Sequence, residues 1–235
     1  MVAMGSYLAS RREAATIRSG DVFGRTEIVG GRDAPGPHAY LVEQAADVEL
    51  RPHFHLTDQF QVAVRGSGRL GRHHALAPVT VHYARGKTAY GPIVAGPEGL
   101  DYLVLRPRVE YGGHYLDGPQ TEVDREAPKF HRTSATVAPE GQASGPQALI
   151  VAADDGLAAW LVRASAGRCA APPIDRPHAG RFHVVLRGSA QLRGEALALW
   201  SCIWCSAGED ALAVDAGDDG LTLLTLQFPA RGHLQ

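Results

Sequence analysis

The sequence has no long hydrophobic run. None of its apolar stretches approaches the roughly 20 residues that a membrane-spanning helix needs. Its first residues, MVAMGSYLASRREAA, also lack the basic segment followed by an apolar one that marks a secretory signal. We therefore expect no membrane partner and a cytoplasmic location.

Cysteine is scarce. Three cysteines occur in 235 residues, an odd number in a chain long enough to fold without disulfides, which is typical of a reducing compartment. Cys202 and Cys205 have C-x-x-C spacing, but they lie in ALALWSCIWCSAG, an apolar segment that indicates a strand. Residues three apart on a strand point to opposite faces. We expect buried packing there, and no zinc or redox centre.

Strong basicity is absent as well. The net charge is -2, and the arginines are scattered along the chain, so the sequence lacks the basic footprint that nucleic acids require. No nucleic-acid partner is expected.

The sequence also has few features that predict helices. The best candidate is SYLASRREAATIRSG, where Ser6 can cap a short helix that ends near Gly20.

What the sequence does contain is an internal repeat. FQVAVRGSGRL at 60–70 matches FHVVLRGSAQL at 182–192, with six of eleven positions identical at an offset of 122 residues. Each copy is interpreted as a strand, an Arg-Gly-Ser turn and a second strand. Shifts of one or two residues pair AYLVEQ at 39–44 with AWLVRA at 159–164, and EGLDYLVLR at 98–106 with DGLTLLTLQ at 219–227. Collinear matches of this kind indicate two copies of one structural unit.

The repeat predicts an all-β chain made of two tandem antiparallel units, each either a closed barrel or a sandwich. Within each copy, short runs rich in Val, Leu and Tyr are separated by turn residues about every ten positions. We predict an N-terminal segment at 1–21, a first barrel at 22–107 and a second at 144–235. The connector at 108–143 is polar and broken by Gly and Pro, and we expect it to cross the surface or reach a second subunit. His114 and His131 lie on it as exposed residues.

The first copy contains RPHFHLTDQFQVAVRGSG, followed by HYARGKTAYGPIVAGPEG. The first segment resembles the first motif of the cupin superfamily, His-x-His, a carboxylate and a Gly, with Gln59 at the carboxylate position. The second resembles the second cupin motif, with Gly86 kept and Tyr90 where a histidine is usual. Together with the duplication, this resemblance implies a bicupin with a double-stranded β-helix (jelly-roll) fold. Cupins of this kind commonly form homodimers.

The resemblance also implies a divalent metal, Fe, Mn, Ni or Zn, in the first barrel. By motif position its ligands would be His53, His55, Gln59 and Tyr90. Gln59 supplies no charge to offset the cation, so affinity should be lower and the facial triad of two His and one carboxylate is incomplete. Asp58, next to Gln59, should face the other side of its strand.

Other residues are assigned around this site. Gln61 and His82 are expected to line the substrate pocket, with metal ligation as the alternative for His82. Tyr90 and His53 are the candidate catalytic residues. Arg106 and Arg108 are interpreted as a solvated strand end, with anion binding as the alternative. The second copy lacks the motif, because its residues at the ligand positions are Asp175, Pro177, Arg181 and Leu212. We expect it to be a structural or dimerisation partner.

Three functions follow as hypotheses. The first is a small-molecule enzyme resembling metal-dependent cupin dioxygenases. The second is a small-molecule-binding protein, a sensor or structural bicupin, that holds no metal. The third is metal-independent isomerisation or lyase chemistry by Tyr90 with a histidine.

Overall fold

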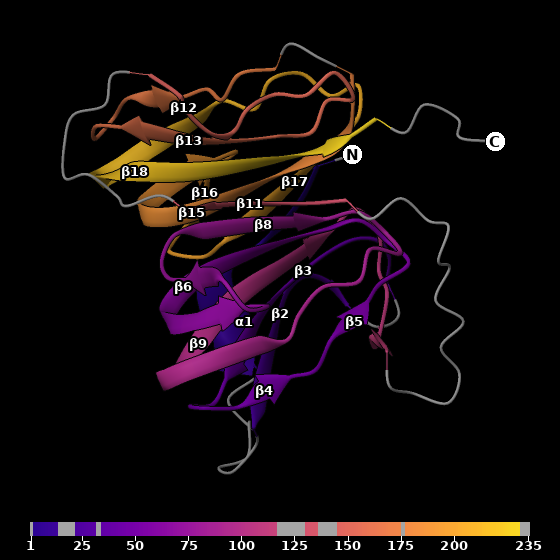
Figure 1. The fold of residues 1–235 in the computed structure, drawn as a ribbon. Helices are drawn as coiled ribbons and strands as arrows, with labels where there is room; N and C mark the ends of the chain where they lie inside the picture. Colours follow the sequence, from indigo (N-terminus) through magenta and orange to yellow (C-terminus); the bar gives the residue numbers. More distant parts are fainter. Residues whose placement is uncertain are drawn as a thin grey trace. The chain divides into compact units, whose positions relative to one another are not determined.

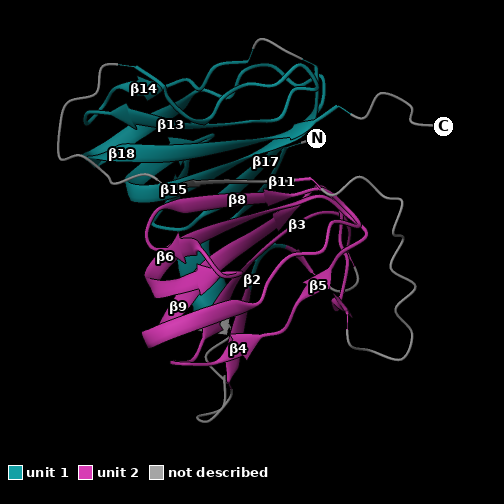
Figure 2. Cartoon of the chain, in the orientation of Figure 1, with its two compact units in different colours: residues 1–15, 27–29, 139–235 teal, residues 16–26, 30–138 magenta. Residues whose placement is uncertain are grey.

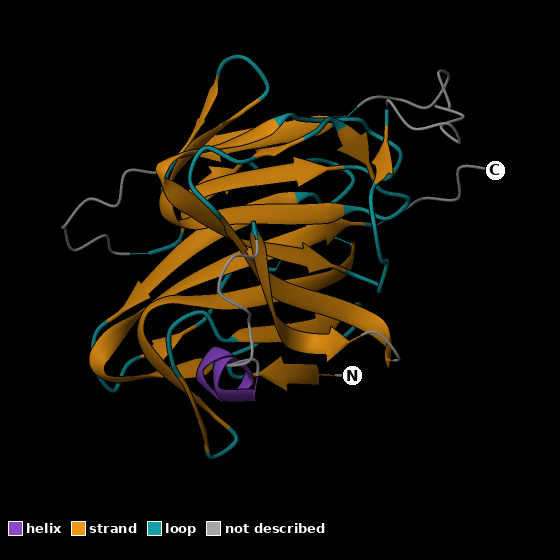
Figure 3. Cartoon of the chain, turned by 90° about the horizontal axis from the view of Figure 1, so that it is seen from below, coloured by secondary structure: helices purple, strands orange, loops and turns teal. Residues whose placement is uncertain are grey.

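The computed structural model describes residues 2–13, 22–31, 34–116, 130–135, 145–174 and 177–230. The chain divides into two compact units (Figure 2). Unit 1 contains residues 1–15, 27–29 and 139–235, and unit 2 contains residues 16–26 and 30–138. Both consist of antiparallel strands, with one short helix in the described part of the chain (Figure 3), so the predicted all-β fold with a short N-terminal helix is confirmed.

Unit 2 is built on an eight-stranded sheet of the described residues, with the order β11-β8-β6-β9-β3-β2 and with β4 and β7 paired to β9 and β6 (Figure 1). Two further strands, β5 and β10, form a separate two-stranded sheet. The strand bounds are β2 Phe23–Gly31, β3 Ala34–Gln44, β4 Glu49–Leu50, β5 His53–Phe54, β6 Gln59–Leu70, β7 His74–Leu76, β8 Thr80–Ala84, β9 Ile93–Arg106, β10 His114–Tyr115 and β11 His131–Ala135.

Unit 1 repeats this arrangement in the order β1-β17-β15-β18-β13-β12, with β14 paired to β18 and β16 paired to β15. Its elements are β1 Val2–Gly5, α1 Tyr7–Glu13, β12 Gln147–Ile150, β13 Ala158–Ala164, β14 Cys169–Ala170, β15 His178–Leu192, β16 Glu195–Leu197, β17 Cys202–Ser206 and β18 Val214–Pro229. The helix begins directly after Ser6, as expected for its cap.

The repeated Arg-Gly-Ser sequence is not a turn. Arg65, Gly66 and Ser67 lie inside the continuous strand β6, where the pairing with β9 shifts register on both sides of Gly66. Gly66 has φ +74°, and a Cβ there would collide with the backbone of Gly99. The predicted turn was therefore wrong because a β-bulge uses the same residue types as a turn. The same register shifts occur around Gly188 in β15.

Equivalent strands of the two units pair in equivalent register. Phe60 of β6 lies opposite Leu105 of β9, and Phe182 of β15 lies opposite Leu226 of β18. All four side chains are fully buried. Residues of one unit can therefore be compared position by position with those of the other.

The N-terminal segment and the connector contribute strands. β1 pairs with β17 in unit 1, and Gly5 has no room for a side chain beside the Ile28 carbonyl. β10 and β11 lie within 108–143, and β11 pairs with β8 in unit 2. Among the described residues, no helix reaches the length and apolarity needed to cross a membrane.

The C-x-x-C pair is buried in β17. Cys202 and Cys205 are free thiols with 0% and 1% of their surface exposed. Burial raises the pKa of both thiols above the usual value. The expected packing role is confirmed, since neither sulfur is accessible or activated as a thiolate.

Candidate functional site

The two motifs of the first copy meet through the backbone. His53 and Tyr90 form an isolated antiparallel bridge, in which His53 N donates to Tyr90 O (3.1 Å) and Tyr90 N donates to His53 O (3.0 Å). Gln59 is the first residue of β6, and His55 lies in the short loop that precedes it. All four side chains are buried, so the structure brings the predicted ligand residues together.

A directed chain of hydrogen bonds links three of them. His53 Nδ1 lies 2.8 Å from the Arg51 carbonyl, and because a carbonyl only accepts, this nitrogen carries the proton. His53 Nε2 is then an acceptor for the Tyr90 hydroxyl, 3.0 Å away. The Tyr90 oxygen in turn accepts from Gln59 Nε2. The His53 Nε2 lone pair and one lone pair of the Tyr90 oxygen are thereby engaged by protons from the protein.

Arg106 completes the chain. It is the last residue of β9, only 2% exposed, and its Nε and Nη2 atoms donate to Gln59 Oε1 at 3.1 and 3.0 Å. Nη2 also lies 3.0 Å from His55 Nε2, and Nη1 donates to the Glu110 carbonyl at 2.6 Å. The interpretation of Arg106 as a solvated strand end was therefore wrong, whereas Arg108 is exposed.

Glu110, which the sequence did not single out, holds His55 from the other side. Its carboxylate oxygens accept the backbone N–H groups of Leu56 (2.9 Å) and Thr57 (2.8 Å), and Oε1 lies 3.4 Å from His55 Nδ1. Burial raises the pKa of Glu110, but the contacts with His55 and the two N–H groups outweigh it and lower the pKa to about 2. Glu110 is thus an anion at neutral pH.

The histidines of the site are neutral. Burial, opposed by the hydrogen bond to Arg51 and assisted by His55 and Arg106, lowers the pKa of His53 to about 4. Burial also lowers the pKa of His55, against the opposing effect of Glu110. Burial raises the pKa of Tyr90, so its phenol stays protonated. The fixed charges are therefore the Arg106 cation and the Glu110 anion.

The remaining predicted residues fall on two sides of this cluster. Gln61 lines the main pocket and its Oε1 lies 2.9 Å from His82 Nδ1, which is opposite it on β8. The His82 ring packs edge-on against Tyr90 with centroids 5.2 Å apart, but His82 lines a separate, smaller space and not the main pocket. Asp58 faces away, as expected, and accepts from Tyr83 Oη (3.0 Å) and Gly86 N (2.8 Å).

A pocket of about 240 Å³ opens onto these residues. Its second cation is Arg25 of β2, whose guanidinium lies 3.7 Å from the Tyr40 ring centroid and 3.2 Å from His38 Nε2. The pocket is lined by His53, His55, Gln61, Tyr90, Arg25 and Arg106, with the aromatic side chains Phe23, Tyr40, Tyr102 and Tyr115. Neither Arg25 nor Glu110 carries a sequence signal, because each lies outside the recognisable motifs.

As they lie, these residues do not fit a divalent metal. The Gln59 carbonyl oxygen and the His55 ring face the Arg106 cation, and His53 Nε2 faces the Tyr90 hydroxyl. A second positive charge in the same place would be strongly repelled. Among the described residues, no group of three or more His, Cys, Asp or Glu side chains is arranged to hold a metal ion.

No protein-family model matches the chain, and no curated protein matches it. Solved structures do. The nickel(II) complex of the bacterial pirin YhhW from Escherichia coli has a TM-score of 0.63 at 10% identity, over 98% of this chain and 100% of that one. Oxalate decarboxylase from Bacillus subtilis has a TM-score of 0.61 at 13% identity, over 97% of this chain and 78% of that one. The chain therefore has the cupin fold. At these identities the likeness concerns the cupin fold alone.

Unit 1, which contains the second copy, has a different interior. Asp175 lies outside the described residues, and Arg181, fully buried, occupies the position equivalent to Gln59. Gln227 lies opposite Arg181, at the position equivalent to Arg106, so the arginine and the glutamine are exchanged between the two units. Arg181 Nη2 donates to the carbonyls of Glu209 and Asp210, both at 3.2 Å. At the positions of the His-x-His pair the sequence of the second copy has Asp175 and Pro177.

Proposed function

We propose that unit 2 binds a small organic anion in its 240 Å³ pocket without a metal. The observation that carries this proposal is the position of Arg106. Its guanidinium contacts Gln59 Oε1 and the ring of His55, two of the groups that would otherwise face a metal. The guanidinium of Arg106 is therefore the cation of the site, and a ligand in the pocket interacts with it.

The electrostatics favour an anion. Among the described residues no carboxylate lies within ion-pair distance of Arg106, and its acceptors are a side-chain amide, a backbone carbonyl and a neutral imidazole. A buried charge with neutral partners is unfavourable. A carboxylate entering the pocket offsets that cost, and guanidinium groups bind carboxylates with well-defined geometry. Arg25 adds a second cation to the wall of the same pocket.

The pocket also favours a small ligand with an apolar body. Its volume lies just below the range of roughly 300–1,000 Å³ that holds drug-sized ligands. Tyr40, Tyr102 and Tyr115 present ring surface, and Tyr90 presents a hydroxyl that is already hydrogen-bonded to His53. For a ligand that is also a substrate, Tyr90 and His53 are the pair placed to exchange a proton with it.

A second candidate is a metal-dependent enzyme of the dioxygenase type. It is favoured by the likeness in fold to a pirin crystallised with nickel(II) and to an oxalate decarboxylase with Mn(II) centres. His53, His55, Gln59 and Tyr90 would hold Fe, Mn, Ni or Zn only after Arg106 had withdrawn from Gln59 and His55.

One experiment separates the two. The full-length protein is incubated in turn with Fe(II), Mn(II), Ni(II) and Zn(II), desalted and submitted to elemental analysis, beside His53→Ala. Calorimetric titrations then compare benzoate and small aliphatic carboxylates with the corresponding neutral amides, with and without chelator. We expect no stoichiometric metal, and carboxylate binding that survives chelator and is lost in Arg25→Gln. One metal per chain that is lost in His53→Ala would establish the enzyme candidate in its place.

A further inference from the structure

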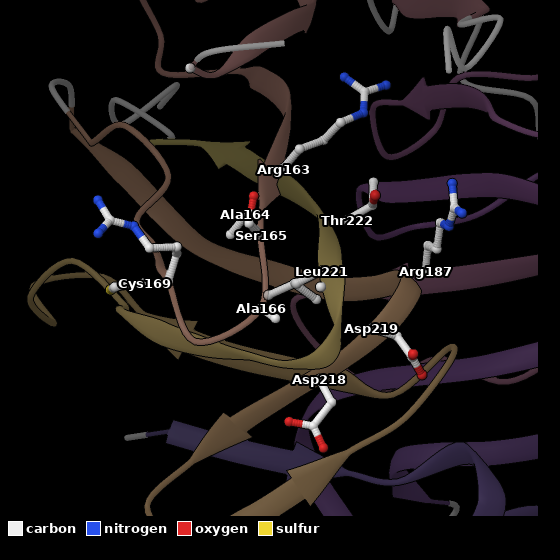
Figure 4. Close-up of a pocket in the computed structure, with 13 residues that line it drawn as sticks. Arg163, Ala164, Ser165, Ala166, Cys169, Arg187, Asp218, Asp219, Leu221 and Thr222 are labelled. Carbon is white, nitrogen blue, oxygen red and sulfur yellow. The ribbon is translucent and has the colours of Figure 1, made fainter. Parts of the chain in front are cut away.

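Three neighbouring strands of unit 1 place two arginines beside each other. Arg163 of β13 lies opposite Thr222 of β18, and Thr222 lies opposite Arg187 of β15. Residues directly opposite each other on neighbouring strands project from the same face of the sheet. Figure 4 shows the Arg163 and Arg187 side chains on either side of Thr222. Two strand spacings separate their backbones, about 10 Å, a gap that two long side chains can bridge to one ligand.

The equivalent positions of unit 2 hold a neutralised arginine. Arg65 corresponds to Arg187, and it lies opposite Asp101, which in turn lies opposite Glu43. Arg65 Nη2 is 2.5 Å from Asp101 Oδ2 and 3.7 Å from Glu43 Oε1. In unit 1, threonine replaces the aspartate and arginine replaces the glutamate. The row therefore holds one cation and two anions in unit 2, and two cations in unit 1.

The two cations of unit 1 are not neutralised by the protein. Among the described residues no carboxylate lies within ion-pair distance of Arg163 or Arg187. Arg163 Nη1 donates to Gln147 Oε1 at 3.3 Å, and its Nη2 is buried without a hydrogen-bond partner. Like charges on adjacent strands are unfavourable without a counter-ion.

These arginines line a large open groove of about 970 Å³. A third cation, Arg168, and the hydroxyls of Ser165 and Thr222 line it as well. The groove also contains Asp218 and Asp219, whose side chains in Figure 4 extend away from Arg163 and Arg187. Positive charge is thus concentrated toward one part of the groove.

We propose that Arg163 and Arg187, with Thr222 between them, form a binding site for a small anion that carries at least two negative charges. Two guanidinium groups can each make paired hydrogen bonds to separate oxygens of such a ligand, and a hydroxyl between them supplies a further donor. A phosphate group and a dicarboxylate share this chemistry. The site lies in unit 1 and does not depend on the function proposed for unit 2.

The test uses isothermal titration of the full-length protein at low ionic strength with inorganic phosphate, succinate and, as a monoanion, acetate. The variant Arg163→Glu/Thr222→Asp rebuilds in unit 1 the row of charges found in unit 2. We expect phosphate, succinate or both to bind more tightly than acetate, and the double variant to lose at least tenfold in affinity. Phosphate alone would identify a phosphate-bearing ligand, and succinate alone a dicarboxylate.

Controls keep the result specific. Arg187→Gln removes one cation with a single change and should weaken binding even if the double variant does not fold, which thermal unfolding would show. Arg65→Gln removes the equivalent arginine of unit 2 and should leave the affinity unchanged. All titrations are made in the Arg25→Gln background, which disables the unit 2 pocket, so that carboxylate binding in unit 2 does not contribute to the measured heat. Equal affinities for all three anions, or dianion binding that persists in Arg187→Gln, would overturn the proposal.

Discussion

His53 and Tyr90, 37 positions apart in sequence, are joined three times: by two reciprocal backbone hydrogen bonds and by a hydrogen bond between their side chains. The two backbone hydrogen bonds fix the main chain of both residues, and the side-chain hydrogen bond fixes the Tyr90 hydroxyl relative to the His53 ring. The site wall is therefore held in one arrangement before any ligand enters, and preorganisation of this kind lowers the entropic cost of binding.

Removal of the Tyr90 hydroxyl tests this arrangement. In Tyr90→Phe, Gln59 Nε2 loses its acceptor and His53 Nε2 loses its donor in a buried site. We expect a loss of about 1–3 kcal/mol in the free energy of unfolding, measured by chemical denaturation. Tyr102→Phe is the matched control, because Tyr102 lines the same pocket and its hydroxyl makes no hydrogen bond to the described residues. Equal losses in both variants would argue against the chain of hydrogen bonds.

The block to metal binding can be reversed by design. Gln59→Glu/Arg106→Gln removes the guanidinium beside His55 and adds a carboxylate near His53 and His55, which is the donor set that divalent transition metals prefer. We expect the variant to retain close to one Ni(II) or Mn(II) per chain after desalting, as measured by elemental analysis. The wild type and Arg181→Gln, which removes the buried arginine of unit 1, should retain far less. Full metal content in the wild type would show that Arg106 does not exclude the ion.

Glu110 should make stability depend on acid pH. Its pKa is about 2 when folded and near 4.5 when unfolded, so its stabilising effect is complete above pH 4.5 and is lost as pH falls toward 2. We expect Glu110→Gln to lower the free energy of unfolding at pH 7 by about 1–3 kcal/mol and to flatten its pH dependence between these values. Denaturation curves across that range provide the measurement. An unchanged slope would contradict the assigned contacts.

His53 should make the free energy of unfolding depend on pH in a neighbouring range. Burial holds its pKa near 4 when folded against 6.5 when unfolded, so the unfolded chain takes up the proton first. Stability should be full above pH 6.5 and decline as pH falls to about 4. His53→Gln should remove part of that decline, as seen in denaturation midpoints at pH 7, 5.5 and 4.5. His183, buried in unit 1 with a pKa of about 3, should contribute a separate part that His53→Gln leaves in place.

The architecture could be predicted because the repeat is visible in the residues themselves. Six identities between 60–70 and 182–192 implied equivalent strands, and the motif positions of His53, His55, Gln59 and Tyr90 implied that these residues converge. The direction of side chains at strand ends could not be predicted from the sequence. Arg106 follows a run of apolar residues and has the composition of a solvated end, yet its side chain turns inward to Gln59.

Two other features could not be predicted for physical reasons. Glu110 lies in a polar connector without periodicity, and only the folded chain places it beside the loop at Leu56 and Thr57. The Arg-Gly-Ser segment carries the residues of a turn, and whether a glycine with positive φ ends a strand or forms a bulge within it depends on the partner strand.

The exchange of arginine and glutamine between the units limits the mutational routes that can connect them. Single substitutions lead from Gln59 hydrogen-bonded to Arg106 to an arrangement like Arg181 opposite Gln227 through one of two intermediates. Arginines on both strands would bury two like charges. Glutamines on both strands are neutral, and their side-chain amides can hydrogen-bond to each other across the sheet. The neutral intermediate is the accessible one, so two copies that diverged by single steps at these positions would have passed through a barrel with no charge there at all.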